Sequence, residues 1–232
     1  MLNLIKLEFK KTKLGWYYKG AVITNLCILG LLCLIGSEEK NLPQAKMSMA
    51  DAASMLLVIG IFVRSVFIVF AGVLIAKLVI GEYKNRTITV MFTYPVSRKK
   101  LMAAKLLLTG GLTFLTMIVS ELILAFIFSQ LNDVYQFSPE KLTMHDVGNE
   151  IGSMLIYAAS STGLSFIPLY FGMRKQSVPA TIVTSCILTT LIGQQSDEFS
   201  LASIIYIPIS LALVGIAIAF WSIRKIDQED VL

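Results

Sequence analysis

Membrane-length apolar segments make up most of the chain, and they constrain its fold more than any other feature. Six such segments occupy residues 19–36, 52–80, 105–129, 151–172, 178–193 and 201–223. Apolar residues are 56% of the 232, more than a soluble domain of this size buries. A chain in lipid must satisfy its backbone hydrogen bonds internally, as a helix does. The sequence therefore predicts an all-α integral membrane protein, a single transmembrane domain over residues 1–232 with six transmembrane helices.

The loops between these segments divide the basic residues unequally between the two sides of the membrane. If the N-terminus is cytoplasmic, the outer loops carry only Lys40, Lys46 and Lys141 of the chain's 20 lysines and arginines, and Arg64 lies within a span. Cytoplasmic loops characteristically hold the excess of basic residues. We therefore predict that both termini are cytoplasmic. The net charge of +5 reflects this topology, and we expect no nucleic-acid partner.

Residues 1–18 have the pattern of a helix that lies in the membrane interface. Lys6, Lys10 and Lys13 fall on one helical face, and apolar side chains cover the remainder. The aromatic residues 16–18 follow, as is typical of the headgroup level. This pattern predicts an N-terminal interfacial helix whose lysines face anionic lipid headgroups.

The most informative polar stretch is residues 81–104, between the second and third predicted spans, which we call the elbow. It begins with Glu82, directly after a long apolar run. Pro95 disfavours helix at the residue before it, and Ser97 is a good N-cap for the residues that follow. We expect a short amphipathic helix near the membrane surface, a proline turn, and a second helix that begins with Arg98 and continues into the bilayer.

The elbow resembles the same region of the ABC-2 type permeases, which are the membrane subunits of ATP-driven exporters. Members of that family commonly have an acidic residue leaving the membrane, a basic or small residue before a threonine, a T-x-P-[VI]-S-R segment, and a lysine entering the third span. The corresponding residues here are Glu82, Arg86-Thr87, Thr93-Tyr94-Pro95-Val96-Ser97-Arg98 and Lys105, with Arg86 where many members have glycine. The six-span topology and the interfacial helix also resemble the family.

The resemblance implies an ABCG-like, type V exporter architecture and a multi-pass subunit of the bacterial plasma membrane that is not itself an enzyme. It also implies a second permease subunit, identical or related, because one six-span chain is half of the usual pore. No GxxxxGK[ST] motif occurs, so a separate P-loop ATPase would bind ATP and Mg, with no cofactor in this chain. The residues implied to couple to that ATPase are Glu82, Arg86, Thr87, Phe92, Pro95, Ser97 and Arg98. The alternative is a basic loop that only fixes topology.

Two charged residues lie inside predicted spans, Arg64 in the second and Glu121 in the third. Burying either charge alone costs about 2.5 to 3.5 kcal/mol on insertion scales. Their depths differ by roughly 6 Å at helical rise, which long side chains on neighbouring antiparallel helices can span. We hypothesise an ion pair between Arg64 and Glu121. The alternative is that one of them lines the translocation path and meets a charged substrate.

The predicted function is therefore a permease that forms the translocation pathway of an exporter. Compact outer loops and apolar spans favour an amphipathic or hydrophobic substrate, and the resemblance suggests a peptide, such as an antimicrobial peptide in an export or immunity system. Two other classes remain open, a secondary transporter and a membrane sensor or assembly protein that transports nothing. A secondary transporter should show an internal inverted repeat or several intramembrane acids, and the sequence has no clear repeat.

Overall fold

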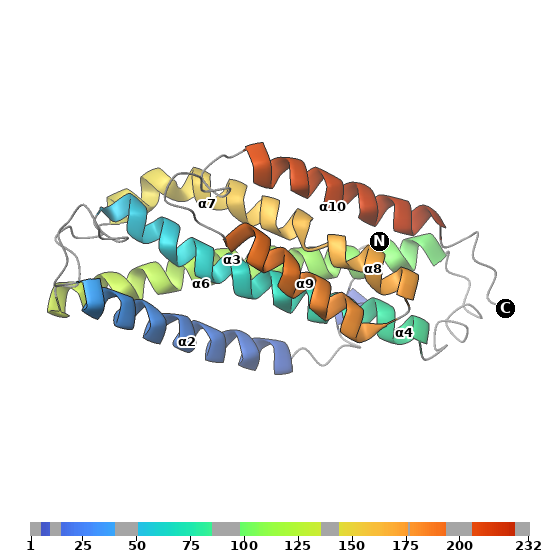
Figure 1. Cartoon of the computed structure of the whole chain (residues 1–232), viewed down its shortest axis with the longest axis horizontal. Helices are drawn as coiled ribbons and strands as arrows, with labels where there is room; N and C mark the ends of the chain where they lie inside the picture. The colour runs from blue at the N-terminus through green and yellow to red at the C-terminus, as the bar shows by residue number, and fades with distance from the viewer. Residues whose placement is uncertain are drawn as a thin grey trace. The chain divides into compact units, whose positions relative to one another are not determined.

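The computed structural model describes residues 6–9, 15–39, 51–84, 98–135, 144–175, 177–193 and 206–225, and every regular element in these ranges is a helix (Figure 1). The helices are α2 (Gly15–Glu39), α3 (Ala52–Ile75), the π-helix η2 (Ala76–Ile80), α4 (Gly81–Lys84), α6 (Arg98–Tyr135), α7 (Met144–Leu164), α8 (Ile167–Lys175), α9 (Val178–Gly193) and α10 (Tyr206–Lys225). The predicted all-α class is confirmed for the described residues.

Several of these helices are long and apolar enough to cross a membrane. Four such stretches are Gly15–Glu38, Ala53–Ile80, Lys99–Tyr135 and Glu150–Lys175, and shorter apolar helices cover Val178–Thr190 and Ile209–Arg224. At 1.5 Å per residue, a helix of 16 residues such as α9 reaches only about 24 Å, against about 30 Å for the hydrocarbon core. The count of six spans and the side on which the termini lie stay predictions.

The helices depart from the predicted spans at several ends. α2 begins at Gly15, not at residue 19. The aromatic residues 16–18, predicted to belong to the interfacial helix, therefore lie in the first turn of α2. α6 continues without a break from Arg98 to Tyr135 and includes the end of the elbow. The fourth predicted span, 151–172, is two helices, because Pro168 has no N–H and its ring would collide with the carbonyl of Leu164. α9 has the predicted bounds 178–193.

The start of α3 shows how local sequence sets a helix boundary. The backbone N–H of Met55 donates to the carbonyl of Asp51 (3.0 Å), which closes the first turn. The Ser54 hydroxyl donates to that carbonyl (2.7 Å) and accepts from the backbone N–H of Asp51 (3.0 Å). This reciprocal bonding satisfies groups that a helix N-terminus otherwise leaves unpaired.

The described residues divide into two compact units, and α3, α6 and α7 each contribute to both. The first unit holds residues 1–14, 67–114 and 159–232. In it, α8 contacts both α9 and α10, and α8 and α9 contact η2 (Figure 1). A Cβ placed on Gly72 of α3 would lie 1.8 Å from Ser185 Oγ of α9, so only glycine permits this close approach. The rings of Tyr170 and Trp221 stack, with centroids 5.9 Å apart, between α8 and α10.

The second unit holds residues 15–66 and 115–158, and in it α2 lies along the C-terminal part of α6 (Figure 1). The Tyr17 hydroxyl is hydrogen-bonded to Thr116 Oγ1 (2.8 Å), and Asn25 Nδ2 donates to Ser120 Oγ (3.0 Å). Apart from these polar contacts, the buried side chains of this unit are mostly apolar. Side-chain hydrogen bonds between helices are a usual means of association in lipid, where no hydrophobic force draws the helices together.

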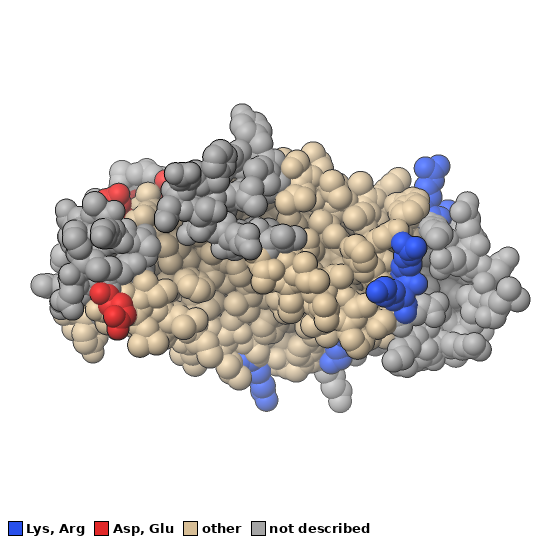
Figure 2. Space-filling view, viewed as in Figure 1, with Lys and Arg blue, Asp and Glu red and all other residues tan. Residues whose placement is uncertain are grey.

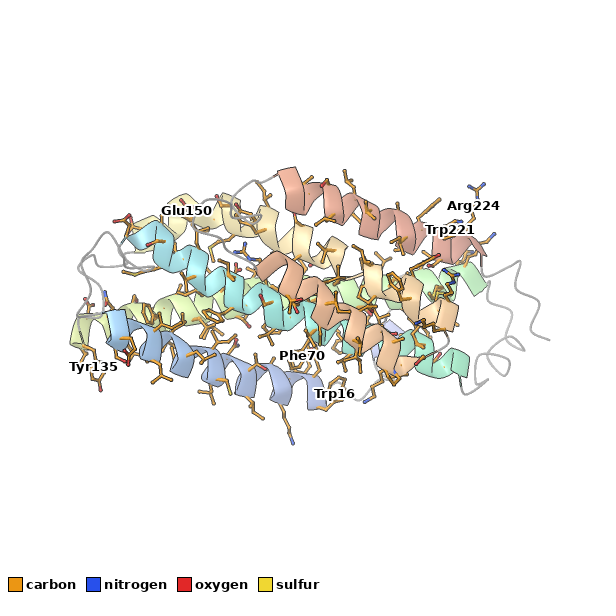
Figure 3. The ribbon with its side chains drawn as sticks, in the orientation of Figure 1. Trp16, Phe70, Tyr135, Glu150, Trp221 and Arg224 are labelled. Atoms are coloured by element: carbon orange, nitrogen blue, oxygen red, sulfur yellow. The ribbon has the colours of Figure 1, made fainter. Side chains whose placement is uncertain are left out.

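The surface has the character of a membrane protein. In the view of Figure 2, most of the described surface carries neither basic nor acidic side chains. α2, α6 and α10 expose large apolar side chains, among them Leu26, Leu115 and Phe220. Figure 3 shows Trp16 at the start of α2 and Tyr135 at the end of α6, at opposite ends of the second unit. Aromatic residues at both ends of a bundle are typical of the two headgroup levels.

Candidate functional site: two buried charge clusters

The first cluster lies in the first unit and centres on Lys105, whose side chain is only 3% exposed. Its ammonium group donates a hydrogen bond to the backbone carbonyl of Leu78 (3.0 Å) and another to the carboxylate of Glu82. A carboxylate oxygen of Glu8 lies 3.8 Å from the same nitrogen. An ammonium has three protons to donate; here two go to acceptors on one stretch of helix, and the Glu8 carboxylate adds an ion-pair contact from a distant part of the chain. We call these residues the Lys105 cluster.

The π-helix η2 places two of the acceptors on one side of the chain. The N–H of Gly81 donates to the carbonyl of Ala76, five residues earlier, which widens the helical turn. Leu78 lies in this turn and Glu82 follows four residues later, so both lie on one face of the helix. π-helical turns of this kind occur often at functional sites.

The charged groups of the Lys105 cluster are buried and depend on one another for neutralisation. The side chains of Glu8 and Glu82 are 5% and 17% exposed, so water solvates them poorly. Removing one partner of a buried ion pair costs about 3 to 5 kcal/mol, because the remaining charge is left uncompensated. The cluster therefore ties the end of α4 and the residues around Glu8 to α6.

The second cluster lies in the second unit and centres on Arg64 of α3. The guanidinium Nε donates to the carbonyl of Gly60, one turn earlier, at 2.9 Å. The guanidinium carbon lies 4.5 Å from the ring centroid of Tyr157 on α7, a cation–π contact. The side chain is 9% exposed. We call this the Arg64 cluster.

Glu121 of α6 completes the Arg64 cluster. It is 1% exposed, and neither of its carboxylate oxygens has a hydrogen-bond partner among the described residues. A Cβ built on Gly60 would lie 2.9 Å from Arg64 Nη2 and 3.2 Å from Glu121 Oε1. Gly60 therefore permits the close approach of both charged groups, because a methyl group here would collide with Arg64. Arg64 and Glu121 lie close together around this glycine, with no hydrogen bond between them.

The comparisons with known proteins identify the family. The family described as ABC-2 family transporter protein matches residues 4–193. The chain belongs to this family. A protein of Bacillus subtilis (strain 168), named "Uncharacterized protein YcbO", is 47% identical over 229 residues, which cover 99% of this chain and 100% of that protein. No solved structure matches the chain.

ABC-2 permeases are membrane subunits, and several residues expected to serve that role here lie outside the described residues. Those are Arg86, Thr87, Phe92, Pro95 and Ser97. Glu82 lies in the Lys105 cluster, and Arg98 is the first residue of α6, where the sequence predicted a helix to begin. Ser97 as its N-cap is not tested.

Sequence reasoning singled out Arg64 and Glu121 in this ABC-2 protein but missed the other members of both clusters. It noted Lys105 only as a motif residue and gave no role to Glu8, Gly60 or Tyr157. The available signal was Lys105 itself, since a lysine at the start of an apolar span either extends to the membrane interface or pairs with an acceptor. Among the described residues, no group of three or more His, Cys, Asp and Glu side chains is arranged to hold a metal ion.

Proposed function

We propose that this chain is the membrane subunit of an ATP-driven exporter and couples a separate P-loop ATPase to a translocation pathway. The observation that supports this proposal best is the Lys105 cluster. The residues that join α4 to α6, 85–97, form most of the elbow, and Lys105 connects the helices on either side of them. Force applied to the elbow would then reach α3, through η2 and α4, and α6 at the same time.

In this proposal the elbow is the docking surface for the ATPase. Glu82, Arg86 and Arg98 supply polar contacts, Phe92 supplies an apolar one, and Thr87, Pro95 and Ser97 shape the turn. ATP and Mg are bound by the partner ATPase, whose closure moves the elbow. Because Lys105 joins the helices on either side of it, the elbow moves as a lever and not as a flexible linker. The two permease subunits that form the pore then alternate between inward-open and outward-open states.

The finer architecture follows the same proposal. The chain crosses the bacterial plasma membrane six times with both termini in the cytoplasm, in the ABCG-like, type V arrangement. A second permease subunit, identical or related, completes the pore. The cargo is amphipathic or hydrophobic, and a peptide, such as an antimicrobial peptide, fits the compact loops and apolar spans. This choice of cargo rests on the family alone.

Co-purification tests the proposal. The tagged chain is purified in mild detergent from its native cells, and the proteins that accompany it are identified by mass spectrometry. The test variant carries Arg86→Ala and Arg98→Ala. The control carries Lys19→Ala and Arg224→Ala, which removes the same charge from two exposed positions outside the elbow; Figure 3 shows Arg224 extending away from α10.

We expect a stoichiometric P-loop ATPase with the wild type and the control, and its loss from the elbow variant. A sister permease in the same sample would identify the second subunit. If the wild type carries no ATPase under conditions that preserve other membrane complexes, the exporter proposal fails and a secondary transporter becomes the better explanation. If the elbow variant keeps the ATPase, the elbow is not the docking surface.

A further inference from the structure

One face of α10 is fixed against the protein by close packing. A Cβ on Gly163 of α7 would lie 2.9 Å from Ala212 Cβ, and a Cβ on Gly215 would lie 2.0 Å from the carbonyl oxygen of Gly163. Small residues allow membrane helices to approach one another in this way. Because this contact sets the rotation of α10, it also sets which side chains the helix turns away from the protein.

The side chains turned away form an apolar row that ends in an arginine. Leu213, Ile216 and Phe220 are each more than half exposed, and Arg224 is exposed as well. A spacing of three or four residues places these four side chains in one row along the helix. Figure 3 shows Arg224 at the end of α10, extending away from it. We call this row the α10 stripe.

α8 lies beside the charged end of the α10 stripe and runs in the same direction as α10. The two helices are in contact, and the rings of Tyr170 and Trp221 stack with their centroids 5.9 Å apart. Earlier along both segments, Gly163 faces Ala212. Residue numbers therefore rise together in the two segments, and their C-terminal ends lie at the same end of the first unit.

This parallel arrangement brings a second arginine to the level of the first. Arg174 follows Tyr170 by four residues, and Arg224 follows Trp221 by three. Each arginine is thus about one helical turn beyond the stacked rings and on the same side of its helix as the ring. Arg174 is exposed, as Arg224 is. Two guanidinium groups therefore lie beyond one pair of stacked rings.

The described residues supply no acidic partner for these two arginines. The acidic side chains of the first unit among the described residues are Glu8 and Glu82, and both contact Lys105. Neither arginine forms an ion pair with a described residue. The end of the stripe therefore carries positive charge that an anion from outside the described residues can neutralise.

We propose that the α10 stripe and Arg174 bind an anionic phospholipid. An acyl chain of the lipid lies along the apolar part of the stripe, and the two guanidinium groups hold its phosphate, whose oxygens fit the planar fork of arginine. The stacked rings lie between these two parts, as is typical of aromatic residues at the headgroup boundary. A lipid with net negative charge is favoured because it brings no cationic group to the two arginines. This inference goes beyond the exporter proposal and does not depend on it.

Fluorescence quenching tests the site, because Trp221 lies within it. The chain has two tryptophans, so Trp16→Phe leaves Trp221 as the single reporter. The full chain with this substitution is reconstituted in bilayers of phosphatidylcholine. A fixed fraction of the lipid is brominated phosphatidylglycerol, or brominated phosphatidylcholine with the same acyl chains. Bromine quenches tryptophan only at short range, so the ratio of the two quenching curves gives the relative binding constant beside Trp221.

Two double variants and one control are compared in this background. Arg174→Gln with Arg224→Gln removes both charges, and Arg174→Lys with Arg224→Lys keeps them. The control is Lys19→Gln with Lys100→Gln, which removes the same charge from two exposed positions outside the site. All the substituted side chains are exposed, so folding should be retained, and size-exclusion profiles verify it.

We expect phosphatidylglycerol to be preferred over phosphatidylcholine by about tenfold or more beside Trp221, since each basic residue near an anionic lipid surface contributes roughly a fivefold gain in binding. The control and the lysine variant should keep most of this preference. The glutamine variant should reduce it to about twofold or less. An excess of soluble glycerol phosphate, added at constant ionic strength, should leave the preference unchanged.

Three results would overturn the inference. Equal quenching of the starting protein by the two brominated lipids would show that no anionic lipid is selected, as expected if the acidic side chains within residues 227–230 neutralise the arginines instead. An equal loss of preference in the glutamine variant and the control would show that only the total charge matters. Loss of the preference on adding glycerol phosphate would identify a soluble anion as the ligand. None of these results bears on co-purification of an ATPase, so the two proposals fail separately.

Discussion

Replacing Lys105 with methionine should destabilise the protein strongly. Methionine has nearly the same length and is apolar, so little packing is lost. The ammonium is lost, which leaves the carboxylates of Glu8 and Glu82 without their shared cation and the Leu78 carbonyl without its donor. Removing one partner of a buried ion pair costs about 3 to 5 kcal/mol. Because Glu82 is 17% exposed and recovers some hydration, we expect about 3 kcal/mol, at the lower end.

The assay is the thermal unfolding midpoint in nanodiscs, followed by tryptophan fluorescence. For a chain of 150–250 residues, a loss of about 3 kcal/mol corresponds to a lower midpoint by about 6 to 12 °C. Lys100→Met makes the same substitution at an exposed position in the same helix. It should change stability by no more than about 0.5 kcal/mol.

A double variant separates the ion pair from any other effect of the substitution. Lys105→Met combined with Glu82→Gln removes the cation and one of the charges it neutralises. The double variant should be more stable than Lys105→Met alone by about 0.5 to 3 kcal/mol, the range of coupling between contacting residues. The reasoning is refuted if Lys105→Met unfolds at the same temperature as Lys100→Met, or if the double variant shows no recovery.

Two further substitutions have defined outcomes. Gly72→Ala would place a methyl group 1.8 Å from Ser185 Oγ and should cost about 1 to 3 kcal/mol of stability. Gly111→Ala is the control and should be neutral or stabilising, because a Cβ at that position meets nothing within 4 Å. Equal unfolding midpoints for the two variants would contradict the close packing of α3 on α9. Tyr17→Phe removes the hydrogen bond to Thr116 and should lower the free energy of unfolding by only about 0.6 kcal/mol, the average for such bonds in membranes. A loss of stability as large as that of Lys105→Met would contradict this expectation.

The positions of the helices were predictable from sequence to the extent that their signals are local. The bounds of α9 match the prediction, and α6 begins at Arg98, after the predicted proline turn. The fourth predicted span, 151–172, lies within one stretch that is long and apolar enough to cross a membrane, Glu150–Lys175, and the helix is interrupted inside it before Pro168. The sequence does not decide this interruption, because a proline in a membrane helix can also be accommodated without a break.

The candidate sites were predictable only in part. Arg64 and Glu121 stand out in sequence because charges are rare in apolar segments, and the structure brings them close together. The contribution of Gly60 could not be predicted from sequence, because glycine occurs in apolar helices for many different structural reasons. The role of Glu8 was equally hidden, because its carboxylate pairs with a lysine that lies far along the chain.

The sequence by itself determined that this is a helical membrane protein of the ABC-2 kind. Hydropathy, loop charge and the motif around Pro95 belong to short stretches, so they can be read without knowing what those stretches touch. Only the tertiary structure decided which partner each buried charge has, such as Lys105 with Glu8 and Glu82. The physical reason is that a buried charge is satisfied through contacts within a few ångströms, and packing between helices, not distance along the chain, sets which groups lie that close.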